Sequence, residues 1–195
     1  MERDSPLRGV TYAMRIGAAA LVSAWLGGCA GPKPAQAPPQ QAAVVAPAPG
    51  GGVLRPFPPT SGFIDCVPYA RAVSGLDLHG DAWRWWPQAN GRYARGNVPR
   101  IGAVLSFTRT KSLTRGHVAV VVAIQNPRQI LVSHANWGSD GDTRGVIHER
   151  QPVIDVSPGN DWSQVRLENT LGTFGRTYPA NGFIYQPPMT TRAGG

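Results

Sequence analysis

The sequence predicts an α+β fold in which a short helix, carrying a cysteine at its start, packs on a mostly antiparallel sheet. Two observations indicate this class. A proline and a glycine bracket a helical stretch near residue 70, and the remaining chain consists of short runs rich in β-branched and aromatic residues separated by turn residues. One helix followed by successive strands is typical of α+β domains rather than of alternating α/β folds.

The helix is expected over Cys66 to Ser74. Pro68 suits the first helical turn, where its missing N–H costs nothing, and Gly75 suits the end of the helix. Cys66 then lies at the positive N-terminal end of the helix, immediately after the acidic Asp65.

Two of the expected strands carry the polar side chains of interest. Period-two alternation places His117 on the same face as Ala119 and Val121, and places His134 on the same face as Asn136. A hairpin centred on Asn126-Pro127 would set Asn136 opposite His117 and His134 diagonal to it. The strands are expected at Ala103–Phe107, His117–Ile124, Gln129–Trp137, Val146–Glu149, Val165–Glu168 and Phe183–Tyr185.

These residues predict a nucleophilic site. A thiol attacks as the thiolate, and a helix start together with a nearby imidazolium lowers the pKa of a cysteine. Cys66 is therefore the candidate nucleophile and His117 the candidate base. Either His134 or Asn136 is positioned to orient His117, and we favour His134. Three tryptophans are candidates for lining a substrate cleft, namely Trp83, Trp86 and Trp137.

The N-terminus has the pattern of an export signal. Arg15 precedes the apolar run from Ile16 to Leu26, which is too short to span a bilayer. Leu26-Gly27-Gly28-Cys29 resembles the bacterial lipobox, so residues 1–28 are interpreted as a signal peptide and Cys29 as a lipidated residue. An ordinary secretory signal, or a disulfide between Cys29 and Cys66, is the alternative. A translation start at Met14 would give a more usual signal than a start at Met1.

Composition then divides the rest of the chain. Proline recurs at about every third position from Ala30 to Pro59, which is typical of a semi-extended tether. We therefore expect a lipidated cysteine and tether over residues 29–59, a catalytic domain over residues 60–187 and a disordered tail over residues 188–195.

Charge is distributed unevenly along the chain. The formal net charge is +8, and no acidic residue occurs between Asp81 and Asp140. A basic surface beside the expected strands would attract a carboxylate-rich substrate. Nucleic acid is not expected as a partner, because the chain is predicted to be exported and contains no nucleic-acid-binding motif.

The ordered motifs from about Gly62 to Tyr185 resemble the CHAP domain, the cysteine, histidine-dependent amidohydrolase/peptidase family. They are Cys66-Val67-Pro68-Tyr69-Ala70, Gly80-Asp81-Ala82 followed by tryptophans, Pro99-Arg100-Ile101-Gly102-Ala103-Val104-Leu105, Gly116-His117-Val118-Ala119-Val120-Val121 and His134-Ala135-Asn136-Trp137. The resemblance implies a papain-like fold, cleavage of amide bonds in peptidoglycan, and no metal or other cofactor.

The resemblance also implies roles for single residues. Cys66 would be the nucleophile, His117 the base, and His134 or Asn136 the orienting group. The chain departs from the family at two positions. Many relatives have glutamate where His134 stands, and many have glutamine where Asp65 stands. A carboxylate does not donate a hydrogen bond to an oxyanion, so the backbone N–H of Cys66 becomes the main candidate donor.

The predicted function is thus a peptidoglycan amidase or endopeptidase, expected to be a monomer and to be held at the bacterial cell envelope by its lipid. Ala30, in place of the aspartate that retains many lipoproteins at the inner membrane, predicts the outer membrane. The rival is an inactive envelope lipoprotein that keeps the fold to bind cell wall or a partner protein.

Overall fold

The computed structural model describes residues 52–138 and 143–187. Their secondary structure is predominantly strand, with helices confined to the first part of the domain. The helical elements are α1 (Cys66–Ser74), the 3-10 turn η1 (Ala82–Arg84) and α2 (Trp85–Gln88). None of the helices in the described residues is long and apolar enough to cross a membrane.

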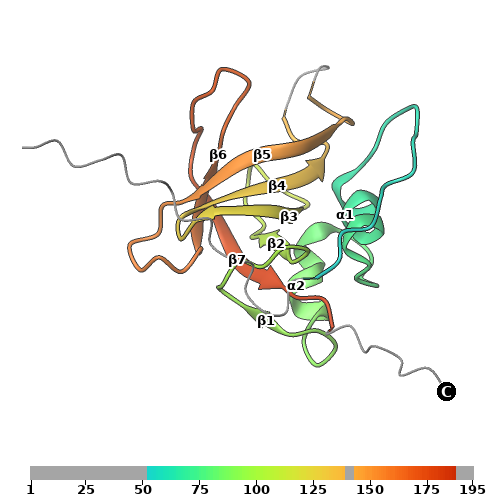
Figure 1. The fold of residues 1–195 in the computed structure, drawn as a ribbon, viewed down its shortest axis with the longest axis horizontal. Helices are drawn as coiled ribbons and strands as arrows, with labels where there is room; N and C mark the ends of the chain where they lie inside the picture. The colour runs from blue at the N-terminus through green and yellow to red at the C-terminus, as the bar shows by residue number, and fades with distance from the viewer. Residues whose placement is uncertain (1–51, 139–142, 188–195) are drawn as a thin grey trace, which may run out of the picture. The chain divides into compact units, whose positions relative to one another are not determined.

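An antiparallel sheet forms the body of the domain (Figure 1). Its strand order is β1-β7-β2-β3-β4-β5-β6, and β6 also pairs with β7, so that six of the strands close into a barrel. The predicted α+β class and mostly antiparallel sheet are confirmed, whereas the closure was not predicted. The strands are β1 (Arg95–Gly96), β2 (Val104–Phe107), β3 (His117–Asn126), β4 (Gln129–Ala135), β5 (Ile147–Asp155), β6 (Gln164–Leu167) and β7 (Tyr178–Ile184).

Alternating side chains of β2 and β3 face two separate cores. Val104, Val118 and Val120 are buried with α1 and α2 on the outer side of the barrel wall. Leu105 and Ala119 face the barrel interior, with further buried residues from β4, β5, β6 and β7. The barrel wall between the two cores therefore carries the helices, which lie on one side of the strands in Figure 1.

Helix α1 has well-defined ends. Asp65 is the residue before its first turn, with an extended backbone, and its side chain does not cap the helix. Gly75 ends the helix in a left-handed conformation (φ 70°) and donates its backbone N–H to the carbonyl of Arg71 at 2.8 Å. The face of α1 that includes Tyr69, Ala70 and Val73 is buried against the sheet.

The segment before α1 also lies on the domain. Arg55 donates its backbone N–H to the carbonyl of Val73 at 2.9 Å, and Val53 donates to Oε1 of Gln186 at 2.8 Å. Contacts with the folded domain thus begin before Thr60.

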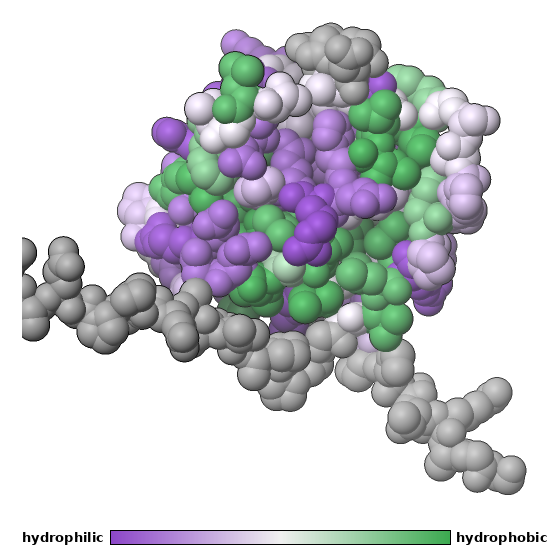
Figure 2. Space-filling model, turned by 45° about the horizontal axis from the view of Figure 1, so that its top comes forward, coloured by the Kyte–Doolittle hydropathy of each residue, from purple (hydrophilic) through white to green (hydrophobic). Residues whose placement is uncertain are grey.

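Hydrophilic and hydrophobic residues both reach the surface on the face drawn in Figure 2.

Candidate active site

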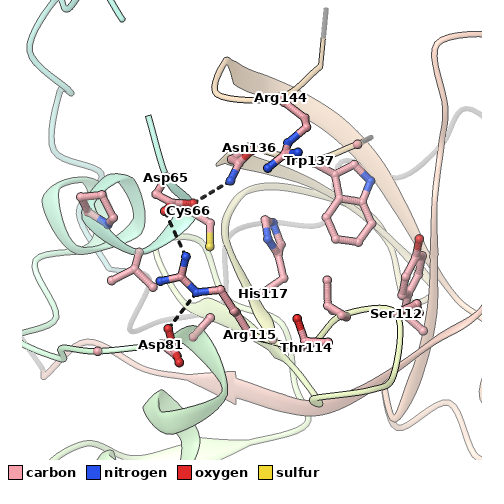
Figure 3. A pocket seen from close by; sticks show the side chains of 18 of the residues that line it. Asp65, Cys66, Asp81, Ser112, Thr114, Arg115, His117, Asn136, Trp137 and Arg144 are labelled. Atoms are coloured by element: carbon pink, nitrogen blue, oxygen red, sulfur yellow. Dashed lines mark hydrogen bonds and ion pairs between the residues drawn. The ribbon is translucent and has the colours of Figure 1, made fainter. Parts of the chain in front are cut away.

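A cleft of about 620 Å³ opens where the start of α1 meets the starts of η1 and β3 and the end of β4. Cys66 and His117 both line it, and in Figure 3 the sulfur of Cys66 points into the space between His117 and Arg115. Asn136 and Trp137 also line it. The fold therefore brings the candidate nucleophile and the candidate base to one cavity from segments about fifty residues apart in sequence.

Cys66 is the first residue of α1 and is largely buried, with 9% of its surface exposed. It carries a free thiol. Burial raises the pKa of this thiol to about 11, and the negative charge of Asp65 adds to the rise, while the backbone N–H of Val118 favours the thiolate. The expected lowering of the cysteine pKa is therefore wrong, because desolvation outweighs the helix start.

His117 is placed by an unusual loop. Gly116, which precedes it, has a left-handed backbone (φ 68°), and a Cβ there would lie 2.6 Å from the backbone nitrogen of Trp83. Only glycine fits this close approach. Trp83 in turn donates its backbone N–H to the carbonyl of Arg115 at 3.1 Å, which fixes the loop at the start of β3.

The side chain of His117 lies at the end of the barrel interior. It packs edge-on against Phe107 of β2, with ring centroids 5.5 Å apart, and its Nε2 lies 2.7 Å from Nδ1 of His134. Trp137 packs against both histidine rings, at centroid distances of 4.6 Å from His117 and 5.7 Å from His134. The pair is therefore shielded from water although His117 borders the cleft.

Burial keeps both histidines neutral. It is the main cause that lowers the pKa of His117 well below its usual value and the pKa of His134 to about 3. The neighbouring His134 and His148 add to the lowering at His117. At neutral pH the site thus contains a neutral thiol and a neutral imidazole, and not an ion pair.

Asn136 takes a different position from the one expected. Strand β4 ends at Ala135, and Asn136 has a left-handed backbone (φ 58°), so the period-two alternation stops before it. Its Nδ2 donates to Oδ1 of Asp65 at 2.6 Å, and its Oδ1 accepts the backbone N–H of Gly145 at 3.1 Å. The predicted common face of His134 and Asn136 is therefore wrong, and it is His134 that contacts His117.

Asp65 belongs to a charged cluster at the cleft rim. Nη1 of Arg115 lies 3.9 Å from Oδ2 of Asp65, and Nε of Arg115 donates to Oδ1 of Asp81 at 2.9 Å (Figure 3). Arg115 partly balances the charge of the carboxylate beside the nucleophile, and Asn136 donates a hydrogen bond to it. No motif singled out Arg115, because its two acidic partners, Asp65 and Asp81, come from distant segments.

The three predicted cleft tryptophans are separated by the fold. Trp137 lines the cleft, whereas Trp83 and Trp86 are not among the lining residues. Trp86 instead borders a different surface hollow, with Asn90 and Arg95. The predicted lipidation site, Cys29, lies outside the described residues. Among the described residues, no group of three or more histidine, cysteine or acidic side chains is arranged to hold a metal ion.

The site consists of a cysteine at a helix start and a histidine at the start of a strand in a closed antiparallel sheet. This arrangement agrees with the resemblance seen in the sequence. Residues 58–136 match the family model of the CHAP domain. The matched segment contains Cys66, His117, His134 and Asn136 and ends before β5. A CHAP domain indicates a hydrolase of the amidase or peptidase type that acts on peptidoglycan. No curated protein matches the chain.

Proposed function

We propose that the chain is a cysteine-dependent peptidoglycan hydrolase that cleaves an amide bond through an acyl-enzyme intermediate. The observation that carries the proposal is that Cys66 and His117 line one cleft. One ring nitrogen of His117, Nε2, contacts His134, and the other, Nδ1, is left for the thiol. The experiment that tests it is the release of soluble fragments from purified cell wall by the wild-type chain and by variants at these two residues.

The mechanism begins from a neutral pair. As the sulfur of Cys66 attacks the carbonyl carbon of the scissile amide, its proton passes to Nδ1 of His117. The carbonyl oxygen becomes an oxyanion, for which the backbone N–H of Cys66 is the main candidate donor. His117 then gives the proton to the departing amine, and a thioester remains on Cys66.

Water completes the reaction. Nδ1 of His117 takes a proton from water as the water oxygen attacks the thioester carbonyl, and the same proton returns to the sulfur as the carboxylic acid leaves. His134 holds the His117 ring in place throughout, because its Nδ1 contacts Nε2 of His117. Because His134 is neutral, it orients His117 without the charge stabilisation that a carboxylate would provide.

The charges at the cleft favour a substrate with carboxylates, such as the stem peptides of peptidoglycan. The lining includes Arg115, Arg144 and Arg176 against two aspartates. Arg115 is paired with those aspartates, and Arg176 donates to the hydroxyl of Tyr178 at 2.8 Å. Arg144 is exposed and has no ion pair within residues 52–138 and 143–187, so its guanidinium is the best candidate to bind a substrate carboxylate.

A second candidate function is binding of the cell wall without cleavage. The raised pKa of the Cys66 thiol and the Asp65 carboxylate beside it favour this alternative, because both oppose formation of a nucleophilic thiolate. We favour the hydrolase, since the neutral thiol and imidazole together can still react by concerted proton transfer. Whether the bond cleaved joins muramic acid to alanine or lies within the peptides is decided by analysis of the fragments.

We further propose that the enzyme is a monomer anchored in the outer membrane through lipidated Cys29. The lipobox-like Leu26-Gly27-Gly28-Cys29 and the proline-rich stretch after it support this proposal. A lipid at Cys29 and an extended tether would let the domain reach peptidoglycan from the membrane surface.

A further inference from the structure

A chain of polar contacts continues from the histidine pair into the barrel wall. Nε2 of His134 lies 2.5 Å from Oε1 of Gln151, a residue of β5. Nε2 of Gln151 donates to the backbone carbonyl of Glu168 at 2.5 Å. The contacts thus run from Glu168 through Gln151 and His134 to His117.

This chain permits only one arrangement of protons when both histidines are neutral. A backbone carbonyl can only accept, so the amide NH₂ of Gln151 must face Glu168 and the amide oxygen must face His134. The oxygen also only accepts, so Nε2 of His134 must carry a proton. Nδ1 of neutral His134 is then unprotonated and accepts from Nε2–H of His117, which leaves Nδ1 of His117 without a proton.

We propose that Gln151 is a positioning residue that sets the tautomers of both histidines, so that His117 presents an unprotonated Nδ1 to the thiol of Cys66. This inference depends on the proposed function for its catalytic consequence. Gln151 does not reach the reacting atoms and acts through His134. It lies beyond residues 58–136, the segment that matches the CHAP model.

The surroundings support a fixed role for Gln151. Gln151 lies opposite Val132 in the pairing of β5 with β4, which brings it beside His134. The carbonyl that it contacts is held in place, because Glu168 donates its own N–H to the carbonyl of Pro152 at 3.0 Å and pairs with Phe174. His134 has no exposed surface, so water does not compete for its Nε2.

The chemical need for such a residue follows from His134 itself. An acceptor-only partner such as a carboxylate would fix the proton on Nε2 of His117 without help. A neutral imidazole can either donate or accept at Nδ1, and if it donated, Nδ1 of His117 would carry the proton and could not act as a base. Gln151 removes this ambiguity.

The test is nitrogen NMR of the full chain with 15N-labelled histidines at neutral pH, in which protonated and unprotonated ring nitrogens have distinct shifts. In the wild-type chain we expect a proton on Nε2 and none on Nδ1 for both His117 and His134. The opposite tautomer at His117 would overturn the proposal. Because this readout does not require turnover, it separates a failure of the tautomer assignment from a failure of the proposed hydrolase function.

The matched variants are Gln151→Leu and, as a control at a site remote from the histidines, Gln129→Leu. Gln151→Leu should yield a mixture of tautomers and lower kcat at least about two-fold with little change in KM, because only part of the population has a usable base. Gln129→Leu should change neither. Unaltered tautomers in a folded Gln151→Leu chain would contradict the inference.

Rescue provides a further criterion. In a His134→Glu background the carboxylate fixes the proton of His117 directly, so adding Gln151→Leu should cost no further activity. An equal loss of kcat in both backgrounds would show that Gln151 acts through general packing and would overturn its assignment as a positioning residue.

Discussion

His117 and His134 contact one another through a single pair of ring nitrogens, Nε2 of the first and Nδ1 of the second, 2.7 Å apart. This contact leaves Nδ1 of His117 as the nitrogen available to the thiol of Cys66. Since Trp137 and the barrel interior shield both rings, the contact orients the base without a charged partner.

The first prediction concerns the third catalytic position. His134→Ala should lower turnover by at least about 10-fold, at the weak end of what positioned acid–base groups contribute, because His117 loses its orienting contact. Asn136→Ala should cost less, since Asn136 bonds to Asp65 and Gly145 instead. His134→Glu should retain or raise activity by stabilising the imidazolium. Turnover of the three variants on one cell-wall preparation, with folding checked by circular dichroism, measures this; a larger loss for Asn136→Ala would refute the assignment.

The second prediction concerns the protonation of Cys66. With the pKa of its thiol raised to about 11, only a small fraction is thiolate at pH 7, and that fraction grows as the pH rises toward 11. Iodoacetamide should therefore label Cys66 more slowly than free cysteine at pH 7, and faster with increasing pH. A fast rate that is already constant below pH 7 would show a thiolate and contradict the neutral pair.

A substitution at Asp65 tests the cause of the raised pKa. Asp65→Asn removes the negative charge that opposes the thiolate and should increase the labelling rate at pH 7. The matched control is Asp81→Asn, which also removes a carboxylate that lines the cleft and pairs with Arg115. Asp81→Asn should leave the rate nearly unchanged, and equal effects of the two changes would argue against a specific contribution of Asp65.

The third prediction concerns recognition of substrate carboxylates. Arg144→Gln should raise KM several-fold with little change in kcat, because the guanidinium would bind a part of the substrate that does not react. Arg109→Gln is the control, since Arg109 is exposed, loses the same charge and is not part of the cleft lining. A comparable rise in KM for both variants would indicate a general effect of charge and no specific contact.

The fourth prediction concerns the anchor. Cys29→Ala should leave the protein in the soluble fraction, or attached by an uncleaved signal, because the residue that would carry the lipid is gone. Detergent phase partitioning and mass spectrometry of the intact protein measure this. Unchanged partitioning together with no loss of lipid mass would refute lipidation of Cys29.

The sequence predicted individual strands well and the pairing of distant strands poorly. Runs of β-branched residues marked the strands around His117 and His134, because both faces of these strands are buried. It did not mark β5 to its full length, since Ile147–Asp155 contains a polar run from His148 to Gln151 and then Pro152. Nor did it predict the closure of the barrel, which depends on pairing of Val165 with Tyr178 and of Gln164 with Pro179.

The site was predictable in its residue types and less so in its interactions. Cys66, His117 and His134 have conspicuous chemistry and spacing, but the contact of Asn136 with Asp65 depends on one left-handed backbone angle after β4. The raised pKa of Cys66 depends on burial that only the packed domain reveals. Gln151 had no motif to mark it, because its role arises from pairing with β4 and from a carbonyl in a third segment.

The fifth and most direct test is mass spectrometry of the soluble fragments released from purified peptidoglycan by the full chain and by its Cys66→Ser and His117→Ala variants. We expect the wild-type chain to release fragments whose new ends come from cleavage of one type of amide bond, and both variants to release none while their thermal unfolding is nearly unchanged. The absence of fragments with the wild-type chain, or their release by either folded variant at the wild-type rate, would contradict a hydrolase that uses Cys66 and His117.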